Sequence, residues 1–297
     1  MEMTAVHIAG GVIIGALIGI LTGIFGVGGG FMLTPLLMVC LGVPAKIAVG
    51  TGLAAILVNS GYGLYHRKNS GTIDIKLSFV ISVGSLVGVV AGSKLLTQLS
   101  HAQRIVVFGR EQDTIEYVLL AAFLVLLLWI AGYLFYDYTR HNGKAPSLRV
   151  GLFSKWHIPP MTDFQSLERS SLSVPVLIVF GVIVGILTGM MGVGGGVVLL
   201  PALVYLVGQR TVKAAGTSLL LVFISSLAAV IKKSAAGDIS LMLLVMLLAG
   251  GLAGTWAGTK IGLKFDGPRI RLYFIYVVIL AAVIVGYKMA LLTFAAR

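Results

Sequence analysis

A glycine-rich stretch that occurs twice constrains this chain more than any other feature. Gly19–Gly30 reads GILTGIFGVGGG, and Gly185–Gly196, 166 positions later, reads GILTGMMGVGGG. Ten of the twelve positions are identical, and a proline follows each copy, at Pro35 and Pro201. Chance does not account for this agreement, so the chain contains an internal duplication.

Each copy lies inside a long run without Asp, Glu, Lys or Arg, from Met3 to Ala45 and from Ser170 to Gln209. The 297 residues are 58% hydrophobic and 11% charged, whereas soluble domains carry about 25% charged residues. The chain is therefore predicted to be an integral membrane protein. Each long run can hold two helical segments. Six further uncharged runs are long enough to cross a hydrocarbon core of about 30 Å, which makes about ten segments in all. The six runs are Ile47–Tyr65, Leu77–Ser93, Tyr117–Tyr136, Ala214–Ile231, Ile239–Thr259 and Leu272–Tyr287.

The glycine runs predict a helix break inside the bilayer. Glycine has no Cβ and destabilises a helix by about 1 kcal/mol per residue relative to alanine. A helix from His7 to Ile24 is therefore expected to stop, and Phe31–Leu41 is expected to form a short re-entrant helix. Backbone amides that leave a helix in hydrocarbon need other partners.

The duplication continues beyond the glycine runs with the same offset of 166. The helix predicted at Leu77–Leu96 carries glycines four residues apart, and the second half repeats them: Gly84, Gly88, Gly92, Gly250, Gly254 and Gly258. Such ridges let another helix approach closely. An odd number of crossings in each half inverts the second half, and inverted repeats place substrate at their interface near the midplane. The predicted fold is an all-α polytopic membrane protein of two inverted homologous halves.

We divide the chain into a first transmembrane repeat (1–136), a basic linker (137–174) and a second transmembrane repeat (175–297). On the inverted topology the linker side holds 14 of the 22 Lys and Arg residues, including Arg67 in a loop. The positive-inside tendency then predicts a cytoplasmic linker and both termini outside. Because the basic residues are scattered through short loops, the net charge of +12 indicates orientation and not nucleic-acid binding.

The glycine runs lack the Lys-Ser/Thr of a soluble phosphate loop. In a membrane, their free amides and the positive end of the following half-helix suit an anion. The predicted substrate-binding residues are three glycines and three polar residues near them in each half: Gly28, Gly29, Gly30, Thr34, Thr51, Asn59, Gly194, Gly195, Gly196, Thr217, Ser218 and Ser225. The alternative stays open that the glycines serve packing and the hydroxyls bond to their own helices. For Asn59, ligand contact and a bond between helices are equally supported.

No catalytic residue, metal ligand or cofactor is predicted. Neither the segment from Met3 to Ile73 nor that from Arg169 to Gly237 contains a carboxylate, so the usual proton or sodium site is missing. The single cysteine, Cys40, excludes an intrachain disulfide. Export of an anion needs no coupling ion, because a membrane potential of about 100 mV is worth roughly 2.3 kcal/mol per charge.

Two copies of G-x-x-x-G-x-x-G-x-G-G-G followed by a proline, each at the head of a glycine-rich half, resemble the sulfite exporter TauE/SafE-like transporter family. The resemblance covers nearly the whole chain apart from the linker. It implies a multi-pass carrier in the plasma (inner) membrane that moves sulfur-containing oxyanions or organosulfonates, such as sulfite or sulfoacetate.

The hypothesis is therefore a secondary transporter, an exporter of small sulfur oxyanions, that works by alternating access at the repeat interface. Its expected partners are the anion and the lipid bilayer; nucleic acid is not one of them, and assembly of several copies stays open. Two alternatives remain: a channel-like facilitator of small solutes, and a membrane subunit that transports nothing.

Overall fold

The computed structural model describes residues 5–100, 105–107, 110–112, 114–140, 151–164, 166–167, 171–192 and 194–294. Within these ranges eight helices are long and apolar enough to cross a membrane, and two shorter apolar stretches follow α1 and α6. The predicted all-helical, polytopic membrane fold with about ten segments is confirmed. The α-helices are α1 (Ala5–Phe25), α2 (Gly30–Cys40), α3 (Ala45–Arg67), α4 (Ile75–Ser100), α5 (Thr114–Arg140), α6 (Val174–Met191), α7 (Gly196–Ala202), α8 (Thr211–Ala235), α9 (Leu241–Gly262) and α10 (Gly267–Phe294).

Smaller elements connect these helices. A hairpin of β1 (Ile105–Val107) and β2 (Arg110–Gln112) lies between α4 and α5, and β3 (Met161–Asp163) pairs antiparallel with β4 (Ser171–Ser173) before α6. A 3₁₀ turn covers Leu152–Lys155, and α7 continues as a π-helix over Leu203–Val207.

The predicted linker, 137–174, is described only in part. Residues 141–150, 165 and 168–170 lie outside the described residues, and with them three of the five basic side chains that the linker carries. The division of the chain at 136 and 174 stays a prediction. In the described part, Phe164 is buried, and the side chain of Lys76 at the start of α4 donates to the carbonyl of Asp163, 3.1 Å away. The linker therefore packs against the helices.

The helix breaks fall at the two glycine runs. Gly26, Gly28 and Gly29 have φ of 68°, 70° and 66°, in the left-handed region. The equivalent Gly192, Gly194 and Gly195 have φ of 72°, 66° and 73°; Val193 lies outside the described residues. Only glycine takes this conformation without strain, so the sequence forces α1 and α6 to end and α2 and α7 to begin in new directions.

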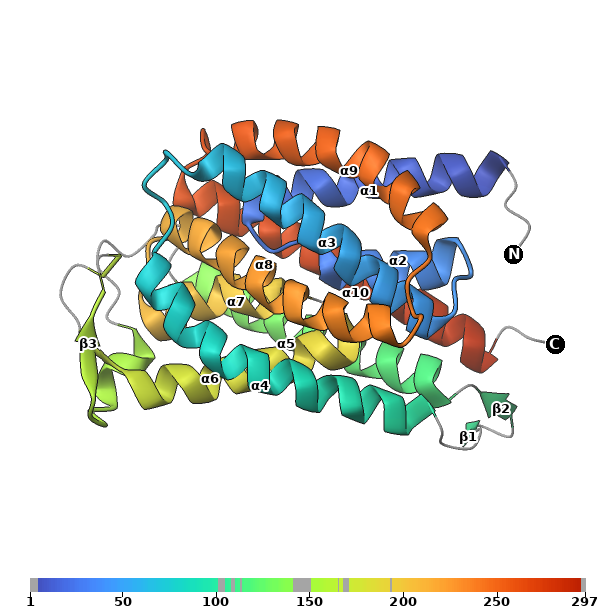
Figure 1. Cartoon of the computed structure of the whole chain (residues 1–297), viewed down its shortest axis with the longest axis horizontal. Coiled ribbons are helices and arrows are strands. Elements are labelled where there is room, and N and C mark those ends of the chain that lie inside the picture. Colours follow the sequence, from blue (N-terminus) through green and yellow to red (C-terminus); the bar gives the residue numbers. More distant parts are fainter. Residues whose placement is uncertain are drawn as a thin grey trace.

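The glycine ridges pair helices from opposite halves. A Cβ atom at Gly19 of α1 would collide with the carbonyl oxygen of Gly251 on α9, and one at Gly88 of α4 would collide with the carbonyl of Val182 on α6. In Figure 1, α1 accordingly runs along α9, and α4 runs along α6. The sequence predicted a close approach at Gly88 and at the other ridge glycines of α4 and α9, but it did not indicate that the partner belongs to the other half.

The two halves are inverted relative to each other. Gly50 near the start of α3 contacts the backbone of Asp238 just after α8, and Gly216 near the start of α8 contacts the backbone of Thr72 just after α3. The equivalent helices α3 and α8 therefore run antiparallel. Figure 1 agrees, because α1 begins and α10 ends at one end of the long axis, whereas β3 lies at the other.

The helices group into two mixed bundles. The first bundle consists of α1, α2, α3 and α9, and the second consists of α6, α7, α8 and α4. Helices α5 and α10 pack against each other beside them. There Arg271 of α10 lies 3.4 Å from the carboxylate of Asp137 on α5, which also accepts a 2.8 Å hydrogen bond from the hydroxyl of Tyr205.

Candidate functional site at the glycine turns

The first turn (Gly26–Gly30) and the second turn (Gly192–Gly196) meet where the two bundles touch. A Cβ atom at Gly196 would collide with the carbonyl of Val27, so the two backbones are in contact. Both turns also face the same two side chains, Ile56 of α3 and Val222 of α8. The structure thus brings together the two glycine runs, which the sequence places 166 residues apart.

The turns leave backbone amides free. The first backbone bonds of α2 run from Met32 and Leu33 to the carbonyl of Gly29, at 3.2 and 3.0 Å, and those of α7 run likewise to Gly195, at 3.1 and 3.0 Å. Among the described residues, no backbone carbonyl accepts from the amides of Gly28, Gly29 or Gly30. Helix starts carry unpaired N–H groups and partial positive charge. The arrangement therefore favours negative charge at the turns.

Three of the predicted polar residues hold the carbonyls of the turns. The hydroxyl of Ser218 donates to Gly26 O at 2.8 Å, that of Thr34 to Gly192 O at 3.5 Å, and that of Ser225 to Gly194 O at 3.4 Å. The hydroxyls of Ser218 and Ser225 also lie 3.1 and 3.2 Å from carbonyls of their own helix, those of Ala215 and Val222. Thr34 and Ser218 each reach across to the turn of the other half. These buried hydroxyls bind the carbonyls of the turns and not their amides. The amides therefore remain available to a ligand.

Thr51 and Thr217 have a different environment. The hydroxyl of Thr51 accepts from the amide of Ser240, 3.0 Å away, before α9. The hydroxyl of Thr217 accepts from the amide of Asp74, 3.1 Å away, before α4. The two bonds are equivalent in the two halves, and each holds the residue that precedes the first turn of a helix. The described contacts of these threonines therefore do not bring them to the turns.

Asn59 is buried, with 1% of its surface exposed, and its Oδ1 atom has no partner among the described residues. Its amide nitrogen lies 2.7 Å from where a Cβ atom of Gly251 would be. The side chain thus occupies the space that this glycine leaves at the interface between α3 and α9, which we call the α3–α9 seam. The described contacts of Asn59 lie in this seam.

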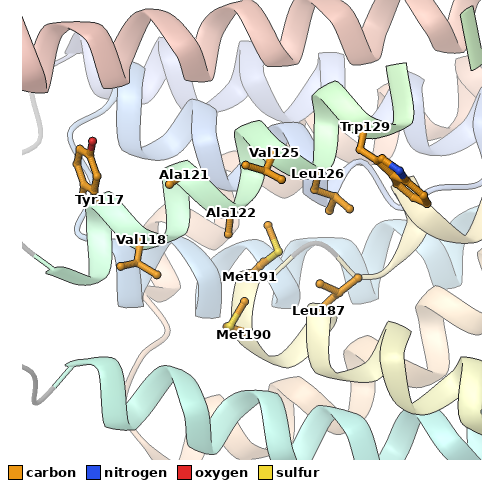
Figure 2. A pocket seen from close by; sticks show the side chains of 10 residues that line it. All are labelled: Tyr117, Val118, Ala121, Ala122, Val125, Leu126, Trp129, Leu187, Met190 and Met191. Atoms are coloured by element: carbon orange, nitrogen blue, oxygen red, sulfur yellow. The ribbon is translucent and has the colours of Figure 1, made fainter. Parts of the chain in front are cut away.

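An open groove of about 800 Å³ lies between α5 and the end of α6 (Figure 2). The lining is almost wholly apolar, and Figure 2 shows Met190 and Met191 of α6 facing α5 across it. These are the two positions at which the glycine runs differ. In the first half, Phe25 instead packs against Phe274, with ring centroids 5.3 Å apart. The groove contains none of the predicted site residues, and its chemistry does not suit an anion.

The buried cation nearest the first turn, Arg67, was not predicted from the sequence. Arg67, assigned to a loop, is the last residue of α3 and is 1% exposed. Its Nη2 atom donates to the carbonyls of Gly23 and Ile24, at 2.6 and 3.3 Å, just before the first turn. The signal was present in the sequence, because the residue 166 positions later, Lys233, is also basic.

Comparison with known proteins agrees with this architecture. A family model described as sulfite exporter TauE/SafE matches residues 11–285. The probable membrane transporter protein YjnA from Bacillus subtilis (strain 168) is 26% identical over 260 residues, which cover 87% of this chain and 91% of the relative. A probable membrane transporter protein from Xylella fastidiosa (strain 9a5c) is 23% identical over 270 residues, 91% of this chain and 90% of the relative.

One relative carries the family name itself. Sulfite exporter TauE/SafE family protein 5 from Arabidopsis thaliana is 32% identical over 118 residues, 38% of this chain and 26% of the relative. No solved structure matches the chain. The family comprises membrane transporters and not enzymes. With its two glycine turns and its inverted halves, this chain is a membrane transporter that belongs to the sulfite exporter TauE/SafE family.

Proposed function

We propose that this transporter exports small sulfur-containing oxyanions, such as sulfite or organosulfonates, and binds them between the two glycine turns. The observation that carries the proposal is the meeting of both turns at the contact between the bundles, with Ile56 and Val222 against each turn. The name of the Arabidopsis relative, a sulfite exporter family protein, supports the substrate class.

The chemistry of the turns supports an anion. Unpaired amides at a helix start contribute about 1 to 2 kcal/mol toward a partly buried negative charge. Two such starts, those of α2 and α7, hold an anion weakly enough to release it. A negative-inside potential of about 100 mV favours expulsion of each negative charge by roughly 2.3 kcal/mol, so export requires no coupling ion.

The proposed mechanism is alternating access by movement of one mixed bundle against the other. The close glycine contacts tie α9 to α1 and α6 to α4, so the moving parts are bundles that each contain a helix from the opposite half. The side chains at their shared surface, Ile56 and Val222, part when the turns open. The moving units are therefore not the two sequence halves themselves.

The proposed location is the plasma membrane, with the linker in the cytoplasm and both termini outside. The excess of Lys and Arg on the linker side supports this orientation. Cysteine labelling of intact cells tests it. In a Cys40→Ala background, a cysteine at exposed Gly42, between α2 and α3, is expected to react with an impermeant maleimide, whereas one at exposed His157 in the linker reacts only after lysis. The reverse pattern contradicts the orientation.

The function is tested by sulfite flux in proteoliposomes at a clamped membrane potential, compared with sulfate, a two-carbon sulfonate and sodium. Saturable anion movement that reverses with the sign of the potential is the expected result. Flux that does not saturate indicates a channel-like facilitator instead. No anion flux in well-incorporated protein contradicts the proposal and favours a subunit that transports nothing.

A further inference from the structure

Arg67 has more hydrogen-bond donors than its surroundings use. Of the five N–H bonds of a guanidinium, the two on Nη2 face the carbonyls of Gly23 and Ile24. Nε and Nη1 are buried and have no partner among the described residues, which leaves three N–H bonds unused. A buried cation without a counter-charge is strongly unfavourable, and the described part of the chain shows no carboxylate paired with this one.

The second half shows what such a cation binds. Lys233 occupies the position of Arg67 and lies 3.1 Å from the carboxylate of Asp238. The residue at the position of Asp238 in the first half is Thr72, whose hydroxyl lies 2.7 Å from that of Ser70. One half therefore supplies an oxyanion of its own beside the buried cation, and the other does not.

Two uncommitted hydroxyls lie on the same seam. Thr255 and Thr259 of α9 are at most 1% exposed, and their Oγ1 atoms have no partner among the described residues. Threonines inside apolar helices usually bond to the carbonyl four residues earlier, as Thr22 and Thr188 do here, at 2.8 and 2.9 Å. The hydroxyls of Thr255 and Thr259 are therefore available to another acceptor.

Contacts between α3 and α9 place the residues that carry these groups at the same interface. A Cβ atom at Gly63 would lie 3.4 Å from the methyl group of Thr255, and one at Gly262 would lie 3.1 Å from Nη2 of Arg67. Gly63 and Arg67 are one turn apart on α3, and Thr259 lies between Thr255 and Gly262 on α9. The seam thus presents donors from both helices at the end of α1, next to the first turn.

We propose that Arg67, with the hydroxyls of Thr255 and Thr259, forms a second binding site for a small oxyanion, separate from the glycine turns. The anion takes the place beside Arg67 that Asp238 has beside Lys233. If Arg67 only capped the carbonyls at the end of α1, that role would account for Nη2. It would leave the other three N–H bonds and both hydroxyls unexplained. The inference depends on the proposed function only in taking the transported anion as the ligand.

The test uses equilibrium binding of radiolabelled sulfite and sulfate to the full chain in detergent, which requires no transport. In Arg67→Gln the number of anions bound at saturation is expected to fall by one per chain. Arg67→Lys keeps the charge and is expected to retain the site with an affinity about three- to tenfold weaker, because an ammonium has three donors instead of five.

A second variant guards against misfolding. Thr72→Asp recreates the carboxylate of the second half and is expected to remove one anion per chain while the melting temperature stays equal or rises. Thr72→Asn, which has the same shape without the charge, is the matched control and is expected to bind as the wild type does. A Thr72→Asp protein that binds the full number of anions overturns the site, as does an Arg67→Gln protein that does so.

The outcomes separate this site from the proposed function. If the wild type binds sulfite or sulfate in an Arg67-dependent way but liposomes show no flux, the proposed function fails and the site stands. If the wild type binds neither anion in detergent, the site is overturned, whatever the liposomes show.

Discussion

Ile56 and Val222 stand at the same position of the two halves and together form a wall against both glycine turns. A Cβ atom at Gly28 would lie 2.9 Å from Ile56 Cγ2 and 2.5 Å from Val222 Cγ1, and one at Gly194 would lie 3.2 Å from each of the same atoms. Neither side chain belongs to one turn alone. Any opening of the site between the bundles must therefore displace this pair.

Exchanging the two side chains tests their equivalence. The double variant Ile56→Val with Val222→Ile conserves volume and is expected to lose less than about 1.5 kcal/mol of stability, with sulfite flux preserved. Ile56→Ala leaves a cavity and is expected to lose roughly 2 to 5 kcal/mol. Thermal unfolding in detergent and flux in liposomes measure both. An inactive exchange variant would show that the two positions are not interchangeable.

Gly29 and Gly42 share a left-handed backbone, with φ of 66° and 60°, but differ in free space. A Cβ atom at Gly29 would lie 2.5 Å from Ile18 Cγ2, whereas nothing lies within 4 Å of one at Gly42. Gly42→Ala is therefore expected to lose only about 1 to 2 kcal/mol from backbone strain and to keep its flux. Gly29→Ala is expected to lose flux as well as stability. Equal behaviour of the two variants would contradict the crowding at the first turn.

The seam between α4 and α6 depends on glycine. Gly88→Ala is expected to destabilise the protein by about 1 to 3 kcal/mol, because the added methyl group collides with the carbonyl of Val182. Gly132 of α5, which has nothing within 4 Å, is the control. Gly132→Ala is expected to be neutral or to stabilise by up to about 1 kcal/mol. A melting temperature that falls equally in both variants would rule out the close approach.

Two buried serines on α8 differ in what they bind. The hydroxyl of Ser218 lies 2.8 Å from Gly26 O of the first turn and 3.1 Å from Ala215 O of its own helix, whereas that of Ser226 donates to Phe223 O of its own helix, 3.1 Å away. Ser218→Ala is expected to cost about 1 to 3 kcal/mol, because it leaves a buried carbonyl with one bond fewer, and to lower the maximal rate of sulfite flux. Ser226→Ala is expected to keep that rate. Loss of flux in Ser226→Ala alone would show that Ser226, and not Ser218, has the functional role.

The fixed offset of 166 made much of the fold predictable. Glycine at Gly26, Gly28 and Gly29 takes a backbone conformation that other residues avoid, so a break there follows from chemistry that the sequence displays. The partner of each ridge was not predictable, because glycines four residues apart mark a close approach without naming the helix that makes it. Only the folded chain shows that Gly19 faces Gly251.

The site was predictable only in outline. The position of a hydroxyl along a helix does not reveal its hydrogen-bond partner. The sequence therefore predicted the same role for Thr51, which accepts from the amide of Ser240, as for Ser218, which donates to the first turn. Arg67 was hidden by its polar neighbours, Lys68 and Asn69, which give it the appearance of a loop residue. Its burial depends on the end of α1, 43 residues earlier in the chain, and no local pattern encodes that contact.

The exchange of helices between the halves determines when each helix meets its partner during synthesis. When the ribosome has completed α5, the glycine face of α1 still has no partner, since α9 follows more than a hundred residues later. The same is true of α4 until α6 is inserted. An ancestral gene that encoded one half could bury these faces only in a dimer of two oppositely inserted copies, and fusion of the two genes would have made that pairing permanent.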